Sequence, residues 1–388
     1  MQTSFFISSR FSEKAKEDKT MKFLHCADIH LDSPFSLALP ADAGKRRTEL
    51  RSDFSSAVLY AKTEGCKLFL IAGDLFDDDF VTKDTMEMLV HEFSAFPSCQ
   101  FVISPGNHDP FCERSPYKLT EWPENVHIFE SPEMGYFDIP ESDVRVWGYA
   151  FTSDTLTSPP LAGFHIPEDS DGKINILLAH ADLGAPLSPY APLSEKELEK
   201  SGFAYAALGH IHKASGIQYA GKTPYAYPGC IEGRGFDETG YKGALVGELT
   251  KETFELRAVR FCKRRYEICT AEITGATSLA GLADKLVKLC GEYGNDTALR
   301  LVLEGVTPPD FAVDPTAIRT LLPNPYELEI KDNTLPLYGA EILKKESTLV
   351  GAFYRKLEPA ITSEDPSERE TAILALKYGL KALNGRDL

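Results

Sequence analysis

The chain has 388 residues, of which 43% are hydrophobic and 26% charged, and its formal net charge is −17 at pH 7. This length exceeds one ordinary hydrophobic core and predicts two or three domains. The sequence argues against a membrane protein or one exported by a signal peptide, because no apolar run reaches roughly 18 residues and residues 1–20 lack an apolar stretch of signal-peptide length. Eight cysteines without a Cys-x-x-Cys pair favour reduced thiols in a cytoplasmic protein.

Residues 1–20 are expected to be a disordered extension that precedes Met21. From residue 21 to 262, strand patterns alternate with helical patterns, which predicts an α/β sandwich. The predicted strands are 22–26, 68–72, 100–104, 144–149, 174–179 and 205–208, and the predicted helices are 53–63 and 85–93. Two proline-rich segments, 158–160 and 185–192, are predicted surface loops, and the second could shape the access of a substrate.

The pattern changes after Cys262. A small α/β domain is predicted at 263–334, with strands at 266–273, 298–304 and 326–331 and helices at 278–290 and 315–322. Its second strand alternates leucines at 299, 301 and 303 with Arg300, Val302 and Glu304, which is typical of a sheet with one buried face.

The last segment, 335–388, predicts two amphipathic helices. Apolar residues recur at helical spacing at 342, 349, 350, 353 and 357, and again at 373, 376, 380 and 383, before Asn384-Gly385 ends the second helix. Both packing on the chain's own core and docking of a partner are compatible with this pattern.

Five short polar motifs follow the predicted strands: Asp28-Ile29-His30, Gly73-Asp74, Gly106-Asn107-His108-Asp109, Ala179-His180 and Gly209-His210-Ile211-His212. The long spacing between them requires their side chains to converge from the ends of separate strands. Hydrolysis of a phosphodiester needs an activated water and neutralised charge on phosphorus, and two cations roughly 3.5–4 Å apart supply both. The motifs therefore predict a two-metal phosphoesterase.

Asp74 is the predicted bridging carboxylate, since Gly73 allows a tight turn after its strand. Asp28 and His30 are two residues apart on an extended segment, so both can face the first ion. His212 could complete the ligands of that ion.

Asn107, His180 and His210 remain for the second ion, a mixed oxygen and nitrogen set that suits Mn²⁺, Fe²⁺, Co²⁺ or Zn²⁺ better than Ca²⁺. His108 is predicted to stabilise the transition state or to protonate the leaving group. Asp109 is predicted to orient the His108 imidazole.

These motifs, extended to Leu31, Asp77 and Leu208, resemble the calcineurin-like metallophosphoesterases. More narrowly, they resemble the DNA-repair nucleases of the SbcD type and their archaeal and eukaryotic double-strand-break counterparts. The tract 227–238 is similar to the nuclease branch, because simpler phosphatases of the superfamily lack it. Asp32, where many of these nucleases have glycine, is more similar to the YhaO-type subgroup.

The resemblance implies a four-layer αββα sandwich whose two metals, usually Mn²⁺, occupy the ligand positions assigned above. It implies that 263–334 is a capping domain that presents DNA, and that the C-terminal helices dock onto an SMC-like ATPase. That ATPase must be a separate protein, because the chain lacks a Gly-x-x-x-x-Gly-Lys-Ser/Thr motif. The related nucleases form dimers, so a homodimer is a further expectation.

The leading hypothesis is thus a metal-dependent DNA nuclease in DNA repair, expected to act as an exonuclease. A hydrolase for small phosphoesters and a non-catalytic adaptor of an ATPase are the alternatives. The acidic charge disfavours DNA binding, which relies on Lys and Arg, and the candidate basic spots are 45–47 and 263–265. Of the other side chains, Asp77 is predicted to orient a ligand and His25 to pack or hydrogen-bond, while His91, His127 and His165 are predicted surface or loop residues.

Overall fold

The computed structural model describes residues 20–35, 40–170, 172–308, 311, 313–336 and 340–383. The chain divides into two compact units, residues 1–265 and 266–388. The predicted domains 263–334 and 335–388 fall almost wholly in the second unit. The predicted extension, except Thr20, and the predicted helix end at Asn384-Gly385 lie outside the described residues.

Two six-stranded sheets form the first unit. The first sheet has the order β14 (Phe254–Arg260), β13 (Gly243–Leu249), β1 (Met21–Cys26), β2 (Leu68–Ile71), β3 (Gln100–Ile103) and β4 (Val126–Ile128). The second has the order β11 (Gln218–Ala220), β12 (Thr223–Ala226), β10 (Tyr205–Gly209), β7 (Ile174–His180), β6 (Val144–Gly148) and β5 (Gly135–Asp138). The central strands of each sheet are parallel, so their carboxyl ends lie at one edge.

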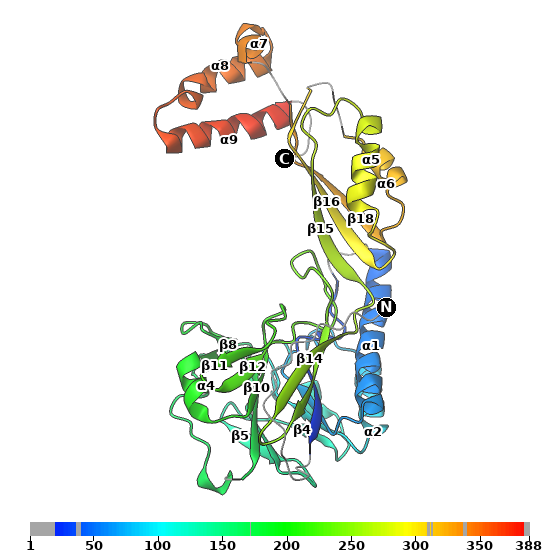
Figure 1. Cartoon of the computed structure of the whole chain (residues 1–388), viewed down its shortest axis with the longest axis vertical. Helices are drawn as coiled ribbons and strands as arrows, with labels where there is room; N and C mark the ends of the chain where they lie inside the picture. Colours follow the sequence, from blue (N-terminus) through cyan, green and yellow to red (C-terminus); the bar gives the residue numbers. More distant parts are fainter. Residues whose placement is uncertain are drawn as a thin grey trace. The chain divides into compact units, whose positions relative to one another are not determined.

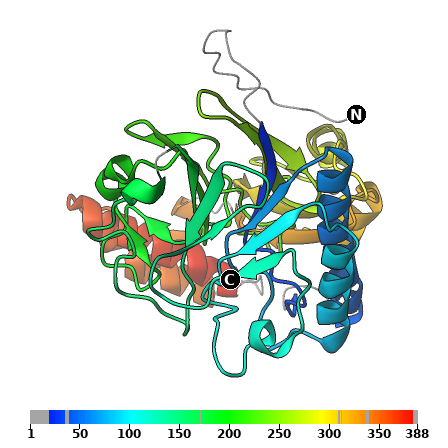
Figure 2. The same cartoon turned by 90° about the horizontal axis from the view of Figure 1, so that it is seen from below.

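The two sheets pack face to face around a shared core, in which Phe23 and Leu70 of the first sheet join Val146 and Leu178 of the second. Helices α1 (Pro40–Thr63) and α2 (Lys83–Ser94) cover the outer face of the first sheet (Figures 1 and 2). The outer face of the second sheet is covered by α4 (Glu195–Ser201), β8 (Asp182–Leu183), β9 (Pro192–Leu193) and loops. The predicted α/β sandwich is confirmed.

The predicted strands of this unit all form, with ends shifted by at most one residue. The helix predicted at 53–63 is the second half of α1, whose first half is too polar to show apolar periodicity. The prediction missed β4, β5 and β11–β14, which lie at or near sheet edges and include several strands of only three or four residues. It also missed the two-residue strands β8 and β9 and the short helices α3 (Pro116–Leu119), η1 (Glu168–Ser170) and α4.

The second unit contains a three-stranded sheet of β15 (Arg265–Glu272), β16 (Thr297–Glu304) and β18 (Glu327–Asp332), with helices α5 (Leu279–Cys290) and α6 (Pro315–Leu321). The short strands β17 (Val306–Thr307) and β19 (Leu335–Pro336) pair with each other. Leu299, Leu301 and Leu303 are buried in its core with Leu286 of α5, which confirms the predicted alternation along β16.

Three helices end the described chain: α7 (Ala340–Lys345), α8 (Leu349–Ile361) and α9 (Pro366–Leu383). The first predicted helix is divided into α7 and α8 because Thr348 caps α8 by accepting a hydrogen bond from the Gly351 amide. Helices α8 and α9 pack against each other (Figure 1). Among the described helices, none combines the length and apolar character needed to cross a bilayer.

A buried ionic cluster in the first unit corrects the interpretation of the two basic spots. Arg46 and Arg264 are buried, and both bind the carboxylate of Glu49 on α1. Arg46 also pairs with Glu232 and donates to the carbonyl of Gly233. These two guanidinium groups therefore stabilise the fold and are not available to DNA.

The cluster predicts a pH dependence of stability. Burial favours a raised pKa for Glu49, but Arg264 and Arg46 outweigh it and lower the pKa to about 2. A carboxyl group with a lowered folded-state pKa stabilises the fold fully above its unfolded pKa, near 4.5, and loses that contribution as the pH falls toward 2. Urea unfolding should show that wild type exceeds Glu49→Gln in stability at pH 6 by on the order of 3 kcal/mol, and that this difference shrinks by pH 3. A difference independent of pH would contradict this account.

Candidate metal centre

The five polar motifs meet where parallel strands of the two sheets end. Asp28 and His30 follow β1, Asp74 follows β2, and His180 and His210 end or follow strands of the second sheet. Backbone hydrogen bonds tie the first two loops together, since the amides of Asp28 and Ile29 donate to the carbonyls of Gly73 and Asp74. The site therefore lies at the carboxyl ends of the strands, as the motif spacing predicted.

The backbone at this edge is strained. Asp28, His30 and Asp74 have φ angles of 51°, 51° and 52°, and His210 has a φ of 100°. Residues with side chains rarely adopt this left-handed region, and such strain concentrates at functional sites because the surrounding structure must hold it.

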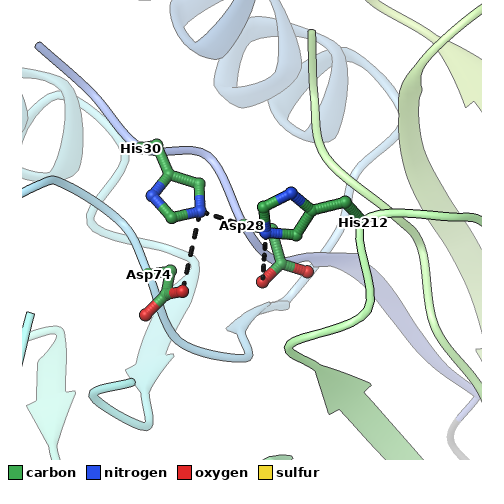
Figure 3. A group of neighbouring side chains, drawn as sticks. All are labelled: Asp28, His30, Asp74 and His212. Atoms are coloured by element: carbon green, nitrogen blue, oxygen red, sulfur yellow. Dashed lines mark hydrogen bonds and ion pairs between the residues drawn. The ribbon is translucent and has the colours of Figure 1, made fainter. Parts of the chain in front are cut away.

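Asp28, His30, Asp74 and His212 form a compact group whose donor atoms all lie within 4.8 Å of one another. The Nε2 atoms of His30 and His212 are 3.3 Å apart, His30 Nε2 is 3.6 Å from Asp74 Oδ2, and His212 Nε2 is 3.8 Å from Asp28 Oδ1 (Figure 3). The two imidazole nitrogens and the two carboxylates thus face one small volume, as expected of ligands to one cation.

Hydrogen bonds on the far side of each ring set the histidine orientation. The Nδ1 atom of His30 lies 2.6 Å from Asp77 Oδ1, and the Nδ1 atom of His212 lies 2.6 Å from Glu238 Oε1. In His180, Nδ1 is 2.9 Å from the Ala72 carbonyl oxygen. An Nδ1–H that donates to these acceptors leaves the Nε2 lone pair directed at the centre.

His180 continues the site on the other side of Asp74. Its Nε2 atom is 3.4 Å from Asp74 Oδ2 and 3.0 Å from Asn107 Oδ1. One oxygen of Asp74 therefore lies near both His30 and His180, which is the position that a bridging carboxylate requires.

His210 stands at the edge of this second group. Its ring centroid is 5.1 Å from that of His180 and 4.8 Å from that of Tyr190, which belongs to the predicted access loop. Its backbone amide donates to Asp28 Oδ1 at 3.0 Å. All seven predicted ligand residues are thus brought to one place, and their roles as ligands remain predictions.

His108 lies at the rim, with 53% of its side chain exposed and its Nδ1 atom 3.6 Å from Asp77 Oδ1. The prediction that Asp109 orients His108 is wrong. Asp109 is buried, and its oxygens accept hydrogen bonds from the amides of Gly106, Asp74 and Leu75 and from the Tyr117 hydroxyl. Asp109 therefore holds the loops that follow β2 and β3 together, and Asp77 is the carboxylate beside His108.

Asp77 was predicted to orient a ligand, and its Oδ1 atom lies 2.6 Å from Nδ1 of His30, one of the predicted ligands. Glu238 and the Ala72 carbonyl act in the same way but were not predicted. The position of Glu238 at the end of the tract 227–238 was the only sequence signal for its role.

Three of the remaining histidines follow their predicted roles, and His127 does not. His25 is buried and bonded to the Tyr205 hydroxyl at 2.8 Å, which confirms a packing and hydrogen-bonding role. His91 and His165 are exposed. His127, predicted to be a surface or loop residue, is instead half-buried on β4, and its Nε2 atom lies 2.8 Å from Gln100 Oε1.

The pKa values of His30, His210 and Asp74 suit metal binding. Burial lowers the pKa of His30, and burial together with His180 lowers that of His210 to about 4. Burial alone would raise the pKa of Asp74, but His180, His30 and the His108 amide outweigh it and hold the pKa at about 2. These shifts favour a carboxylate at Asp74 and neutral imidazoles at His30 and His210, the forms that bind metal ions. In contrast, burial raises the pKa of Asp28 and, against the effect of burial, the hydrogen bond to Glu238 raises the pKa of His212.

The buried carboxylates also fit a cation at this place. Asp28 and Asp74 are at most 1% exposed, and across the described ranges no lysine or arginine forms an ion pair with either. Buried charges without a compensating partner are costly, so the arrangement calls for cations between the carboxylates. The Asp/His cluster is suited to two metal ions, and on this fold it defines a metal-dependent phosphoester hydrolase.

Comparison with known proteins gives the family. Residues 21–214 match the sequence model of the calcineurin-like phosphoesterases. A metallophosphoesterase described as uncharacterized, YhaO of Bacillus subtilis, is 30% identical over 302 residues, which cover 74% of this chain and 72% of YhaO. The chain belongs to the calcineurin-like phosphoesterase family, a family of metal-dependent hydrolases.

Two further similarities extend the comparison. The DNA double-strand break repair protein Mre11 of Aeropyrum pernix is 30% identical over 226 residues, which cover 54% of this chain and about half, 53%, of Mre11. A dimetal phosphatase from Danio rerio aligns in structure with 61% of this chain and 96% of its own, at 13% identity and a TM-score of 0.37.

The contacts of His30 and His212 predict the effect of losing their acceptors. Asp77→Asn and Glu238→Gln should each weaken Mn²⁺ binding about 10–100-fold, because the Nδ1–H of the predicted ligand histidine loses a charged acceptor. Isothermal titration of metal-free protein with Mn²⁺ measures this. Glu113→Gln, which changes an exposed carboxylate on a loop, is the matched control, and unchanged affinity in both variants would contradict the assigned orientation of the histidines.

Close packing at Gly209 predicts a second effect. A Cβ atom at this position would lie 1.7 Å from the Ala72 carbonyl oxygen, the same oxygen that His180 contacts. Gly209→Ala should therefore destabilise the protein by about 2 kcal/mol or more and displace His180. Thermal unfolding should show an equal or slightly higher melting temperature for Gly44→Ala on α1, where the nearest atom to the added Cβ is Arg47 Nη2 at 4.0 Å, and equal melting temperatures for both variants would contradict the packing.

Proposed function

We propose that this protein is a metal-dependent DNA nuclease that acts as an exonuclease in DNA repair in the cytoplasm. The observation that carries the proposal is the buried Asp/His centre with the half-exposed His108 at its rim. The similarity to Mre11 and the tract 227–238 beside His212 support DNA as the substrate.

The proposed ligands of the first ion are Asp28, His30, Asp74 and His212, and those of the second are Asp74, Asn107, His180 and His210. Mn²⁺ is the proposed metal, since a mixed oxygen and nitrogen set suits it. When bound, the two ions supply a water of lowered pKa and neutralise charge on the scissile phosphate.

Groups of the protein itself supply the proton for the leaving group and fix the position of the proposed bridging carboxylate. His108 can carry a proton to the departing 3′ oxygen, because its ring is open to solvent while Asp77 faces its Nδ1 atom. The His108 backbone amide donates to Asp74 Oδ1 at 3.0 Å, so the same loop fixes the proposed bridging carboxylate and places the acid.

We further propose that the second unit presents DNA and that its C-terminal helices dock onto a separate SMC-like ATPase. The support is apolar surface on this helical segment, where Leu349, Ile373, Leu374 and Tyr378 are each at least 46% exposed. A homodimer is part of the same proposal.

Hydrolysis of small phosphoesters is the second candidate. The net charge of −17 and the burial of Arg46 and Arg264 favour it, because both reduce the attraction of the protein for a polyanion. A non-catalytic adaptor role is disfavoured by the complete set of Asp, Asn and His side chains and by His108.

A cleavage assay with Mn²⁺ separates these candidates. Wild type should degrade linear end-labelled DNA and spare closed circles, and His108→Ala should lose about 10²–10⁴-fold in turnover while retaining its metal content. His165→Ala, an exposed histidine on a loop, is the matched control. Turnover of bis-p-nitrophenyl phosphate with DNA left intact would instead establish the small-phosphoester activity, and full activity of His108→Ala would contradict its role.

A further inference from the structure

Arg234 lies beside the metal centre although no proposed ligand role requires it. It belongs to the tract 227–238, which packs around the loop of His212: the Cys230 amide donates to the His212 carbonyl, and Glu238 orients the His212 ring. The tract thus places a guanidinium group at the edge of the site.

One side of Arg234 is held by the protein. Its backbone amide donates to Glu238 Oε2 at 2.7 Å, and its Nη2 atom is 3.3 Å from Glu238 Oε1 and 3.2 Å from His212 Nδ1. Its positive charge also helps to lower the pKa of Asp77, after burial and the contacts of His30 are taken into account. Arg234 therefore lies close to both carboxylates that orient His30 and His212.

The other side of Arg234 is free. Within the described part of the chain, Nε and Nη1 donate to no protein group, and neither is among the buried side-chain atoms that lack a partner. The side chain is 21% exposed, so these nitrogens are open to solvent. His108 borders Asp77 as well and is also exposed, which places a cation and the proposed acid around the same carboxylate.

This arrangement suits a phosphate. A guanidinium group carries a positive charge and N–H donors for phosphate oxygens, and one whose orientation is already fixed loses less conformational entropy on binding. Because Arg46 and Arg264 are buried in ion pairs, a cation at the centre itself is well placed to attract a polyanion to this acidic protein.

We propose that Arg234 binds a phosphate of the DNA strand next to the scissile phosphate and so favours polynucleotides over isolated phosphoesters. This inference rests on the proposed nuclease function. It makes Arg234 a specificity-determining residue that acts by direct contact with the substrate.

The test compares two substrates in the full-length Mn²⁺-loaded protein: a DNA oligonucleotide, and bis-p-nitrophenyl phosphate, which has no neighbouring phosphate. For Arg234→Gln, the ratio of kcat/KM for DNA to kcat/KM for the small ester should fall at least tenfold, through a raised KM for DNA. The slope of log KM for DNA against log salt should fall by about one. Arg234→Lys, which keeps the charge without the fixed guanidinium plane, should fall between wild type and Arg234→Gln.

Arg257→Gln is the matched control, because it removes an arginine charge from β14 at a partly exposed ion pair with Glu64. Equal losses on both substrates, with weakened Mn²⁺ binding, would show that Arg234 acts only through Glu238 and His212 and would overturn the inference. Unchanged kinetics in both Arg234 variants would overturn it as well. If wild type leaves DNA uncut, the nuclease proposal fails and the inference fails with it, whereas DNA cleavage that is insensitive to Arg234 refutes the inference alone.

Discussion

The burial of two carboxylates, Asp28 and Asp74, among imidazoles is the constraint on which the rest of the site depends. Burial disfavours negative charge on both carboxylates and raises the pKa of Asp28, so cations bound at this place would stabilise the charged groups. Hydrogen bonds around the site orient the histidine rings toward the same place. Asp77, Glu238 and the Ala72 carbonyl each contact the Nδ1 atom of one histidine, which leaves its Nε2 atom facing the centre.

The parallel strands supply the position of this centre, and irregular backbone supplies its geometry. Strand ends from two facing sheets bring distant motifs to one edge. The left-handed conformations of Asp28, His30 and Asp74 then direct side chains inward, at a cost that the packed loops offset. Asp109 holds these loops together, since its carboxylate accepts hydrogen bonds from three backbone amides of the turns.

The sequence predicted the elements whose signals are local. Apolar runs located the central strands, the alternation along β16 located a one-sided sheet, and motif order located the donor residues. What it missed depends on long-range contacts. Asp109 follows His108 in sequence, yet its side chain turns into the loops, and Glu238 reaches His212 across 26 residues. Arg46 and Arg264 belong to runs of basic residues that are typical of an exposed surface, but both are buried and bind the carboxylate of Glu49.

The central claim is that the Asp/His cluster holds two metal ions with Asp74 between them. Anomalous diffraction from crystals soaked in Mn²⁺ tests it most directly. The account predicts two anomalous peaks, one beside His30 and His212 and the other beside His180 and Asn107, with the Asp74 carboxylate in contact with both. A single peak, or a pair of peaks with Asp74 bound to neither, would contradict it.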